Sequence, residues 1–99
     1  MEKKQVTVMV RLKTKPGMGP RLKQAALRLI PITRQEPGCI NYYFHIDSAD
    51  ANSFMFYENW MSKKDLDEHI KMPYLQEFLK LLDEVLADPQ DFKFWQMLE

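Results

Sequence analysis

The chain has 99 residues, of which 45% are hydrophobic and 28% charged, an ordinary composition for one globular domain with a modest core. Fourteen basic residues balance fourteen acidic ones, so a net charge of zero gives no field to attract nucleic acid or an anionic membrane. No apolar run approaches the roughly 20 residues that a membrane-spanning helix needs, and a single cysteine excludes an intrachain disulfide.

The first predicted strand covers residues 5–14, where apolar and polar side chains alternate with the period of two of a half-buried strand. The segment before it lacks the apolar core of a signal peptide, and with Cys39 as the lone thiol this predicts a cytoplasmic domain. One face of the strand carries Val6, Val8, Val10 and Leu12, and the other carries Thr7, Met9, Arg11 and Lys13.

A helix is predicted after the break at Lys15-Pro16-Gly17, because apolar residues then recur at helical spacing. They are Leu22, Ala25, Ala26, Leu29 and Ile30. Pro31 has no backbone N–H, so we expect it to kink this helix or end it early. Glu36-Pro37-Gly38 is typical of a turn.

The second predicted strand, residues 39–47, has one apolar face and one face rich in hydrogen-bonding groups. The apolar face carries Ile40, Tyr42, Phe44 and Ile46, and the polar face carries Cys39, Asn41, Tyr43, His45 and Asp47. After a hairpin loop at 48–52, residues 53–61 form a third strand that is apolar on both sides, so we expect both of its faces to be covered.

A short helix is predicted to begin at Ser62-Lys63-Lys64-Asp65, which resembles a capping box with Asp in place of Glu or Gln. Its inward positions are Leu66, His69 and Ile70, and Pro73 restarts or redirects the helix. The continuation has an apolar stripe of Leu75, Phe78, Leu79, Leu82, Val85 and Leu86. Asp88-Pro89 then breaks it, and residues 92–98 form a fourth strand.

This order of elements, βαββαβ, predicts an α+β ferredoxin-like domain with a four-stranded antiparallel sheet, spanning residues 1–99. Two helices cover only one face of such a sheet. The other face is predicted to carry more apolar surface than water tolerates, so we expect a homodimer. That surface is Met9, Tyr43, Trp60 and either the Phe92/Phe94 or the Trp95/Met97 side of the last strand.

Several short motifs then resemble the antibiotic biosynthesis monooxygenase family. They are EPGC at 36–39 with Tyr42, YENW at 57–60, and Leu66, His69 and Pro73-Tyr74 in the spacing L-x-x-H-x-x-x-P. The resemblance covers nearly the whole chain. It implies a ferredoxin-like protomer paired through its sheet into a dimeric α/β barrel, with a pocket beside each sheet.

The resemblance also implies a choice of activities. Some relatives are cofactor-independent monooxygenases of quinols and polycyclic phenols, others degrade haem, and one group isomerises a small phosphorylated compound. Haem-degrading relatives use an asparagine in the first strand and a histidine in the second helix. The matching positions here are Val10 and Leu79, which cannot ligate iron.

The leading hypothesis is therefore a cofactor-independent monooxygenase whose partners are a small aromatic substrate and molecular oxygen. His69, Trp60 and Asn41 are its candidate catalytic residues: an imidazole can exchange protons near neutral pH, an indole can stack on a flat substrate, and an amide can bind its oxygen. The candidate substrate-binding residues are Tyr43, His45, Glu58 and Met9, with His45 as the second possible base. No metal ligand set is recognisable.

Each of these residues also has a purely structural interpretation. His69 and Trp60 can be core side chains, Tyr43 a dimer contact, and Glu58 a partner in an interface ion pair. Two other functions therefore stay open: an isomerase of a small polar carbonyl compound, and a dimeric ligand-binding module without catalysis.

Overall fold

The computed structural model of the chain describes residues 4–99, so the first three residues of the predicted 1–99 domain lie outside the described part. The elements are β1 (Val6–Lys13), α1 (Gly19–Thr33), β2 (Cys39–Ile46), β3 (Ser53–Trp60), α2 (Lys63–Lys71), α3 (Pro73–Val85) and β4 (Asp91–Gln96). The predicted βαββαβ order is confirmed. Pro73 starts a new helix, so the second helical segment is two helices.

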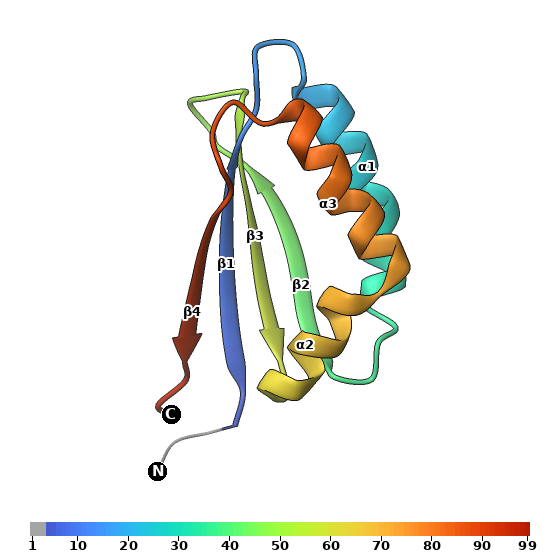
Figure 1. Cartoon of the computed structure of the whole chain (residues 1–99). Coiled ribbons are helices and arrows are strands. Elements are labelled where there is room, and N and C mark those ends of the chain that lie inside the picture. Colours follow the sequence, from blue (N-terminus) through green and yellow to red (C-terminus); the bar gives the residue numbers. More distant parts are fainter. Residues whose placement is uncertain (1–3) are drawn as a thin grey trace.

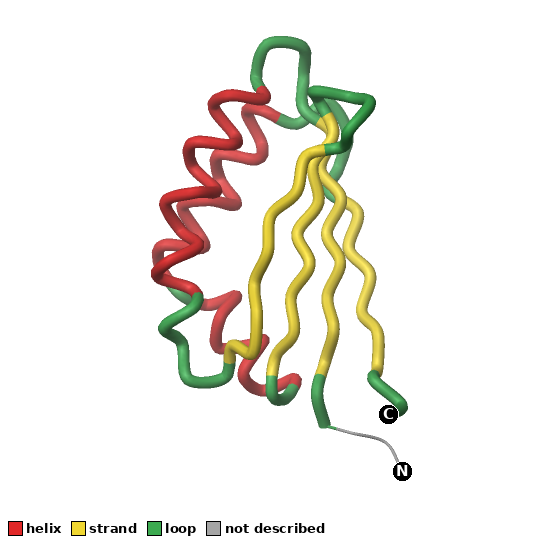
Figure 2. The backbone as a smooth tube through the Cα atoms, turned by 180° about the vertical axis from the view of Figure 1, so that it is seen from behind, coloured by secondary structure: helices red, strands yellow, loops and turns green. Residues whose placement is uncertain are grey.

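The four strands form one antiparallel sheet in the order β2-β3-β1-β4, and the three helices lie on one side of it (Figures 1 and 2). This is the ferredoxin-like α+β fold that the order of elements predicted. The core fills the space between sheet and helices, where Val8, Val10 and Leu12 of β1 meet Phe54 and Phe56 of β3. No helix in residues 4–99 is long and apolar enough to cross a membrane.

Of the two outcomes predicted for Pro31, a kink or an early end of α1, the early end was wrong. The helix continues past Pro31 to Thr33. Pro31 and Leu27, whose carbonyl loses its usual N–H partner, are both exposed on the outer side of the helix. Water can therefore replace the missing hydrogen bond, which lowers the cost of an internal proline.

The predicted faces of β2 need a correction at both ends of the strand. A register shift between Cys39 and Asn41 places Cys39 opposite Trp60, so Cys39 shares the helix-covered face and not the polar one. Ile40 at this irregularity and Ile46 at the far end remain 47% and 55% exposed. Of the four predicted apolar residues, only Tyr42 and Phe44 pack into or against the core.

The largest correction concerns Trp60, which was predicted on the uncovered face of the sheet. Trp60 pairs with Val6 and lies on the helix-covered face, where it is fully buried. Phe92 and Phe94 share that face because they pair with Val10 and Val8, and Trp95 points to the uncovered face. We use "the open face" below for the uncovered side of the sheet.

Candidate functional site

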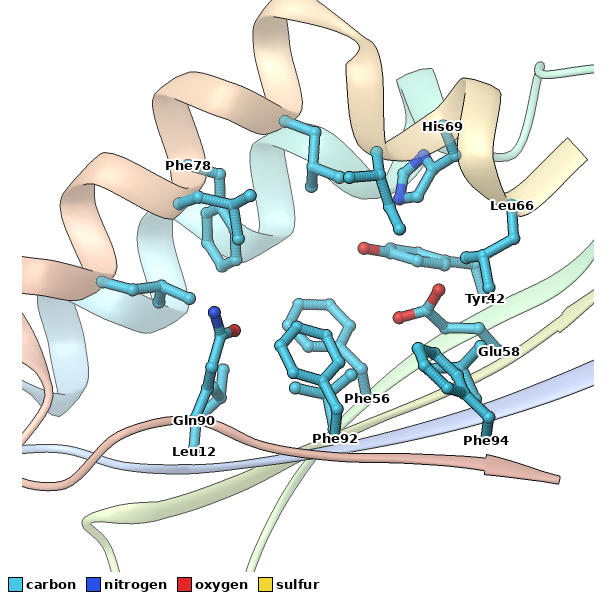
Figure 3. Close-up of a pocket in the computed structure, with 16 residues that line it drawn as sticks. Leu12, Tyr42, Phe56, Glu58, Leu66, His69, Phe78, Gln90, Phe92 and Phe94 are labelled. Atoms are coloured by element: carbon cyan, nitrogen blue, oxygen red, sulfur yellow. The ribbon is translucent and has the colours of Figure 1, made fainter. Parts of the chain in front are cut away.

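A cavity lies between the helix-covered side of the sheet and helices α2 and α3 (Figure 3). Its walls are largely apolar and come from all four strands and both helices. The half-exposed side chains of Phe92 and Phe94 line it along β4, the edge strand, which packs chiefly against β1 and receives little cover from the helices. The cavity therefore opens toward β4.

The volume of the cavity is about 80 Å³. For comparison, an engineered apolar cavity of about 150 Å³ binds benzene. A bicyclic ligand would therefore have to displace Phe92 or Phe94 or project between them.

His69 reaches this cavity from α2, as the sequence predicted, and is 2% exposed (Figure 3). The other side of its ring is held by a carboxylate: Nδ1 lies 2.7 Å from Oε2 of Glu36, in the turn before β2. The hydroxyl of Tyr74, at the start of α3, donates to the same Glu36 oxygen. Glu36 thus joins the turn, α2 and α3 at one point.

Burial lowers the pKa of His69, and the hydrogen bond and charge of Glu36 offset this only in part. The imidazole is therefore neutral near pH 7. With the Glu36 carboxylate as acceptor, the ring proton belongs on Nδ1, and Nε2 keeps its lone pair on the side that faces the cavity. This is the arrangement of a general base that a carboxylate orients.

A second ionisable group, Glu58 of β3, enters the cavity from the sheet (Figure 3). It is 5% exposed, and its Oε1 accepts a hydrogen bond of 2.9 Å from the indole Nε1–H of Trp60. Burial raises the pKa of Glu58 to about 7, the Trp60 hydrogen bond lowers it somewhat, and the negative charge of Glu36 adds to the rise. The carboxyl can therefore gain or lose a proton near neutral pH.

Trp60 was predicted to stack on a flat substrate, but it is not among the residues that line the cavity. Its ring packs behind His69, with centroids 4.5 Å apart and an angle of 30° between the planes. Trp60 is the last residue of β3. It contacts His69 and Glu58, and these two side chains line the cavity. Trp60 therefore positions two cavity side chains and is not placed to stack on a ligand itself.

The remaining predicted site residues lie on the open face, away from His69. Asn41, Tyr43 and His45 share that face of β2, as predicted, and Met9 lies on the same side of β1. Asn41 accepts a 2.9 Å hydrogen bond from the buried amide of Asn59. Within this protomer the sheet separates Asn41 from His69, so the structure does not bring these two predicted site residues together.

Two residues of the site were not predicted as such. Glu36 and Tyr74 both stood in the quoted motifs, but Glu36 was interpreted only as part of a turn. They contact His69 through the fold, since 33 residues separate Glu36 from His69 along the chain. The signal available in the sequence was that one acidic residue, one histidine and one tyrosine each stand inside a motif of the same family.

Other chemistry finds less support in the described residues. Burial raises the pKa of the Cys39 thiol to about 11, so this cysteine is a poor nucleophile. Within residues 4–99, no three His, Cys, Asp or Glu side chains gather closely enough to hold a metal ion. The arrangement can take a proton from a ligand at His69 Nε2 and exchange another at Glu58, in largely apolar surroundings.

The sequence of this chain matches both the profile of a protein family and individual known proteins. Residues 5–81 match the sequence profile of a family described as antibiotic biosynthesis monooxygenase. The protein sll1783 of Synechocystis is 34% identical over 94 residues, 95% of this chain, and the chain spans only 64% of that protein's length. Rv0793 of Mycobacterium tuberculosis is 30% identical over 84 residues, 85% of this chain and 82% of that protein.

Solved structures share the fold. Rv0793 superposes with a TM-score of 0.89 at 27% identity, over 96% of each chain. A structure from Nitrosomonas europaea has a TM-score of 0.93 at 17% identity and covers 99% of this chain and 94% of its own. At that identity the similarity concerns the fold alone.

Proposed function

Because this chain belongs to the antibiotic biosynthesis monooxygenase family, we propose that it is a cofactor-independent monooxygenase acting on a quinol or polycyclic phenol. The observation that carries the proposal is the neutral His69, held through Nδ1 by Glu36 and turned with Nε2 toward an apolar cavity. In this scheme His69 is the base, and Glu58 is a second proton-exchanging group at the opposite wall.

The chemistry needs a substrate that can act as its own reductant. His69 Nε2 removes a phenolic proton, and the electron-rich anion then transfers electrons to molecular oxygen. One oxygen atom forms a C–O bond with the ring, and the other leaves as water with two hydrogens taken from the substrate. For a quinol this gives a hydroxyquinone plus water, so atoms and electrons balance without an added reductant.

The apolar cavity supports this scheme in two ways. Low polarity around His69 favours the neutral, basic form of the imidazole. Aromatic side chains, including Phe56, Phe78 and Phe92, offer flat surfaces for a ring to pack against. Exclusion of water also protects a reactive anion from side reactions.

The protein is proposed to work as a cytoplasmic homodimer. The open face carries Met9, Tyr43, Met55, Tyr57 and Trp95, and Tyr43 and Trp95 are about half exposed. A second copy seated on this face would remove that apolar surface from water. The prediction that both faces of β3 are covered depends on such a partner.

Oxygen consumption by the purified protein tests the proposed reaction, with no flavin, nicotinamide or metal added and a panel of quinols, anthrones and naphthols as substrates. We expect His69→Gln to lower the turnover rate by about 10²- to 10⁴-fold, the usual contribution of a general base. Glu36→Gln should cause a smaller loss, on the order of tenfold, because the base remains but its orienting charge is removed.

The second histidine provides the matched comparison. His45→Gln makes the same chemical change on the open face, where the imidazole bonds the backbone of Met55 and does not line the cavity. If His45→Gln abolished uptake and His69→Gln did not, the site would belong on the open face. No uptake above the buffer rate with any substrate would contradict the proposed reaction and favour a ligand-binding module.

A further inference from the structure

The ionisable side chains in the cavity wall indicate what charge a bound ligand can have. Three ionisable side chains line it: Tyr42, Glu58 and His69. In residues 4–99, neither a lysine nor an arginine is among the lining residues. Gln90 adds a neutral amide, and the other lining side chains are apolar. A bound ligand therefore meets acidic and neutral groups but no cation.

The carboxylate behind His69 strengthens this asymmetry. Glu36 is bonded by the imidazole and by the Tyr74 hydroxyl, two neutral donors, and its side chain is 9% exposed. Arg34, close by in sequence, is turned elsewhere: its guanidinium donates to the backbone carbonyl of Tyr42 at 2.8 Å and lies over the ring of Tyr43. The negative charge at this end of the cavity is thus not neutralised by a basic side chain in the cavity wall.

An anionic ligand would bear two costs in such a place. Its charge would leave water without gaining a cationic partner, and it would be repelled by carboxylates through a medium of low polarity. An uncharged aromatic alcohol bears neither cost. Its hydroxyl can donate to His69 Nε2, and its ring can pack between the phenylalanines.

We infer that the cavity selects uncharged aromatic alcohols and rejects their phosphorylated or carboxylated counterparts, with Glu58 as the residue that enforces the selection. The inference rests on the proposed function, which supplies the substrate class of quinols and phenols. It adds that the bound molecule must be uncharged. It argues against the phosphorylated carbonyl compounds that an isomerase of this family would take.

Ligand binding tests this selection separately from oxygen chemistry. Under anaerobic conditions at about pH 8.5, where the Glu58 carboxyl is largely ionised, 1-naphthol and 1-naphthyl phosphate are titrated into the protein. Binding is followed by tryptophan fluorescence, because Trp60 lies directly behind His69 and Glu58. The wild type should bind 1-naphthol about 100-fold more tightly than the phosphate. Glu58→Gln, which keeps an acceptor for the Trp60 indole, should narrow that ratio by about tenfold.

Two further variants make the test decisive. Glu84→Gln removes an acidic charge from the exposed surface of α3 and should leave the ratio unchanged. Phe94→Lys places a cation at the mouth of the cavity, where the side chain of residue 94 is 62% exposed, and should admit the phosphate. If Glu58→Gln does not fold, Phe94→Lys carries the test alone.

The outcomes separate this inference from the proposed function. Equal affinity of the wild type for the two ligands, or no binding of 1-naphthol, would overturn the inference. Selective binding of 1-naphthol without oxygen uptake by any substrate would keep the inference and defeat the monooxygenase proposal. Oxygen uptake with an anionic substrate would support the monooxygenase proposal and overturn the inference.

Discussion

At the scale of single residues, the site depends on two ionisable groups that burial shifts in opposite directions. The pKa of Glu58 rises to about 7 because burial penalises its charged form, and that of His69 falls for the same reason. Both shifts favour the uncharged side chain. Near pH 7 His69 is therefore neutral and Glu58 is about half ionised, so His69 can accept a proton from a ligand and Glu58 can exchange one.

The raised pKa of Glu58 predicts a dependence of stability on pH. A carboxyl whose folded-state pKa is about 7, against 4.5 in its ordinary state, stabilises the fold fully below pH 4.5. That contribution is lost as the pH rises from 4.5 through 7, because in this range the native state holds a proton on Glu58 that the unfolded chain has already released. His69 acts in the other direction, since its lowered pKa destabilises the fold as the pH falls below 6.5.

Glu58→Gln isolates the first effect, because the amide cannot ionise and still accepts from Trp60. We expect its free energy of unfolding, relative to the wild type, to increase by roughly 2 to 3 kcal/mol between about pH 5 and pH 8. Urea denaturation at a series of pH values measures this difference, with the exposed Glu84→Gln as control. A difference that does not change with pH would mean that Glu58 is ionised in the folded protein throughout the range.

At the scale of elements, the position of His69 depends on how α2 is attached to the end of the sheet. Ser62 caps the helix by accepting from the backbone N–H of Asp65 at 3.2 Å, and its hydroxyl donates to the Asp65 carboxylate at 2.7 Å. The N-cap half of the predicted capping box is confirmed, and the Asp65 carboxylate bonds the Ser62 hydroxyl in place of its backbone N–H. The backbone of Gly38 passes directly beside Asp65, and its carbonyl accepts from the N–H of Met61.

Gly38→Ala is expected to disturb this attachment, because a Cβ built at position 38 would overlap the Asp65 side chain. Overpacking of this kind typically costs about 1–3 kcal/mol of stability. Asp65→Gly removes the atoms nearest to the added methyl group. A double-mutant cycle in thermal or urea unfolding should therefore show that Gly38→Ala costs less in the Asp65→Gly background. Additive effects would place the contact elsewhere.

At the scale of the whole molecule, the two sides of the sheet have different roles. All the helices of residues 4–99 lie on one side of the sheet (Figure 2). That side holds the core and the cavity, and the open face carries polar and apolar side chains from the same four strands. Asn59 is only 2% exposed on the open face, where it joins Asn41, Thr7 and Gln5 in a hydrogen-bonded group. This face is the surface that the proposed homodimer would use.

A charge in the middle of the open face tests the dimer. Met9 lies on the central strand β1, between Tyr57 and Lys93. We expect the wild type to sediment as a dimer and Met9→Lys as a monomer, because a lysine there would lose water and be repelled by the neighbouring Lys93. Leu27→Lys makes a comparable change on the exposed outside of α1 and should leave the dimer intact. A monomeric wild type would remove the basis for this interface.

Much of the fold could be predicted because it follows from local periodicity. Alternation in β1 assigned Val8 and Val10 to the core, helical spacing located α1 and α3, and the Ser62 motif placed the start of α2 within a residue. These patterns are statements about neighbours along the chain, and the physical constraints behind them act over one or two turns. They also placed His69 on the inward side of its helix.

Tertiary structure decided which side of the sheet the helices cover, and this changed the site. Period-two alternation says that Trp60 and Glu58 share a face, but not whether that face looks toward the helices or away from them. The pairing of β3 with β1 settles the question, because Trp60 lies opposite Val6 in the core. Likewise, Glu36 meets His69 and Tyr74 only when the turn, α2 and α3 pack together. Such contacts depend on the packing of distant segments, which no local pattern in the sequence encodes.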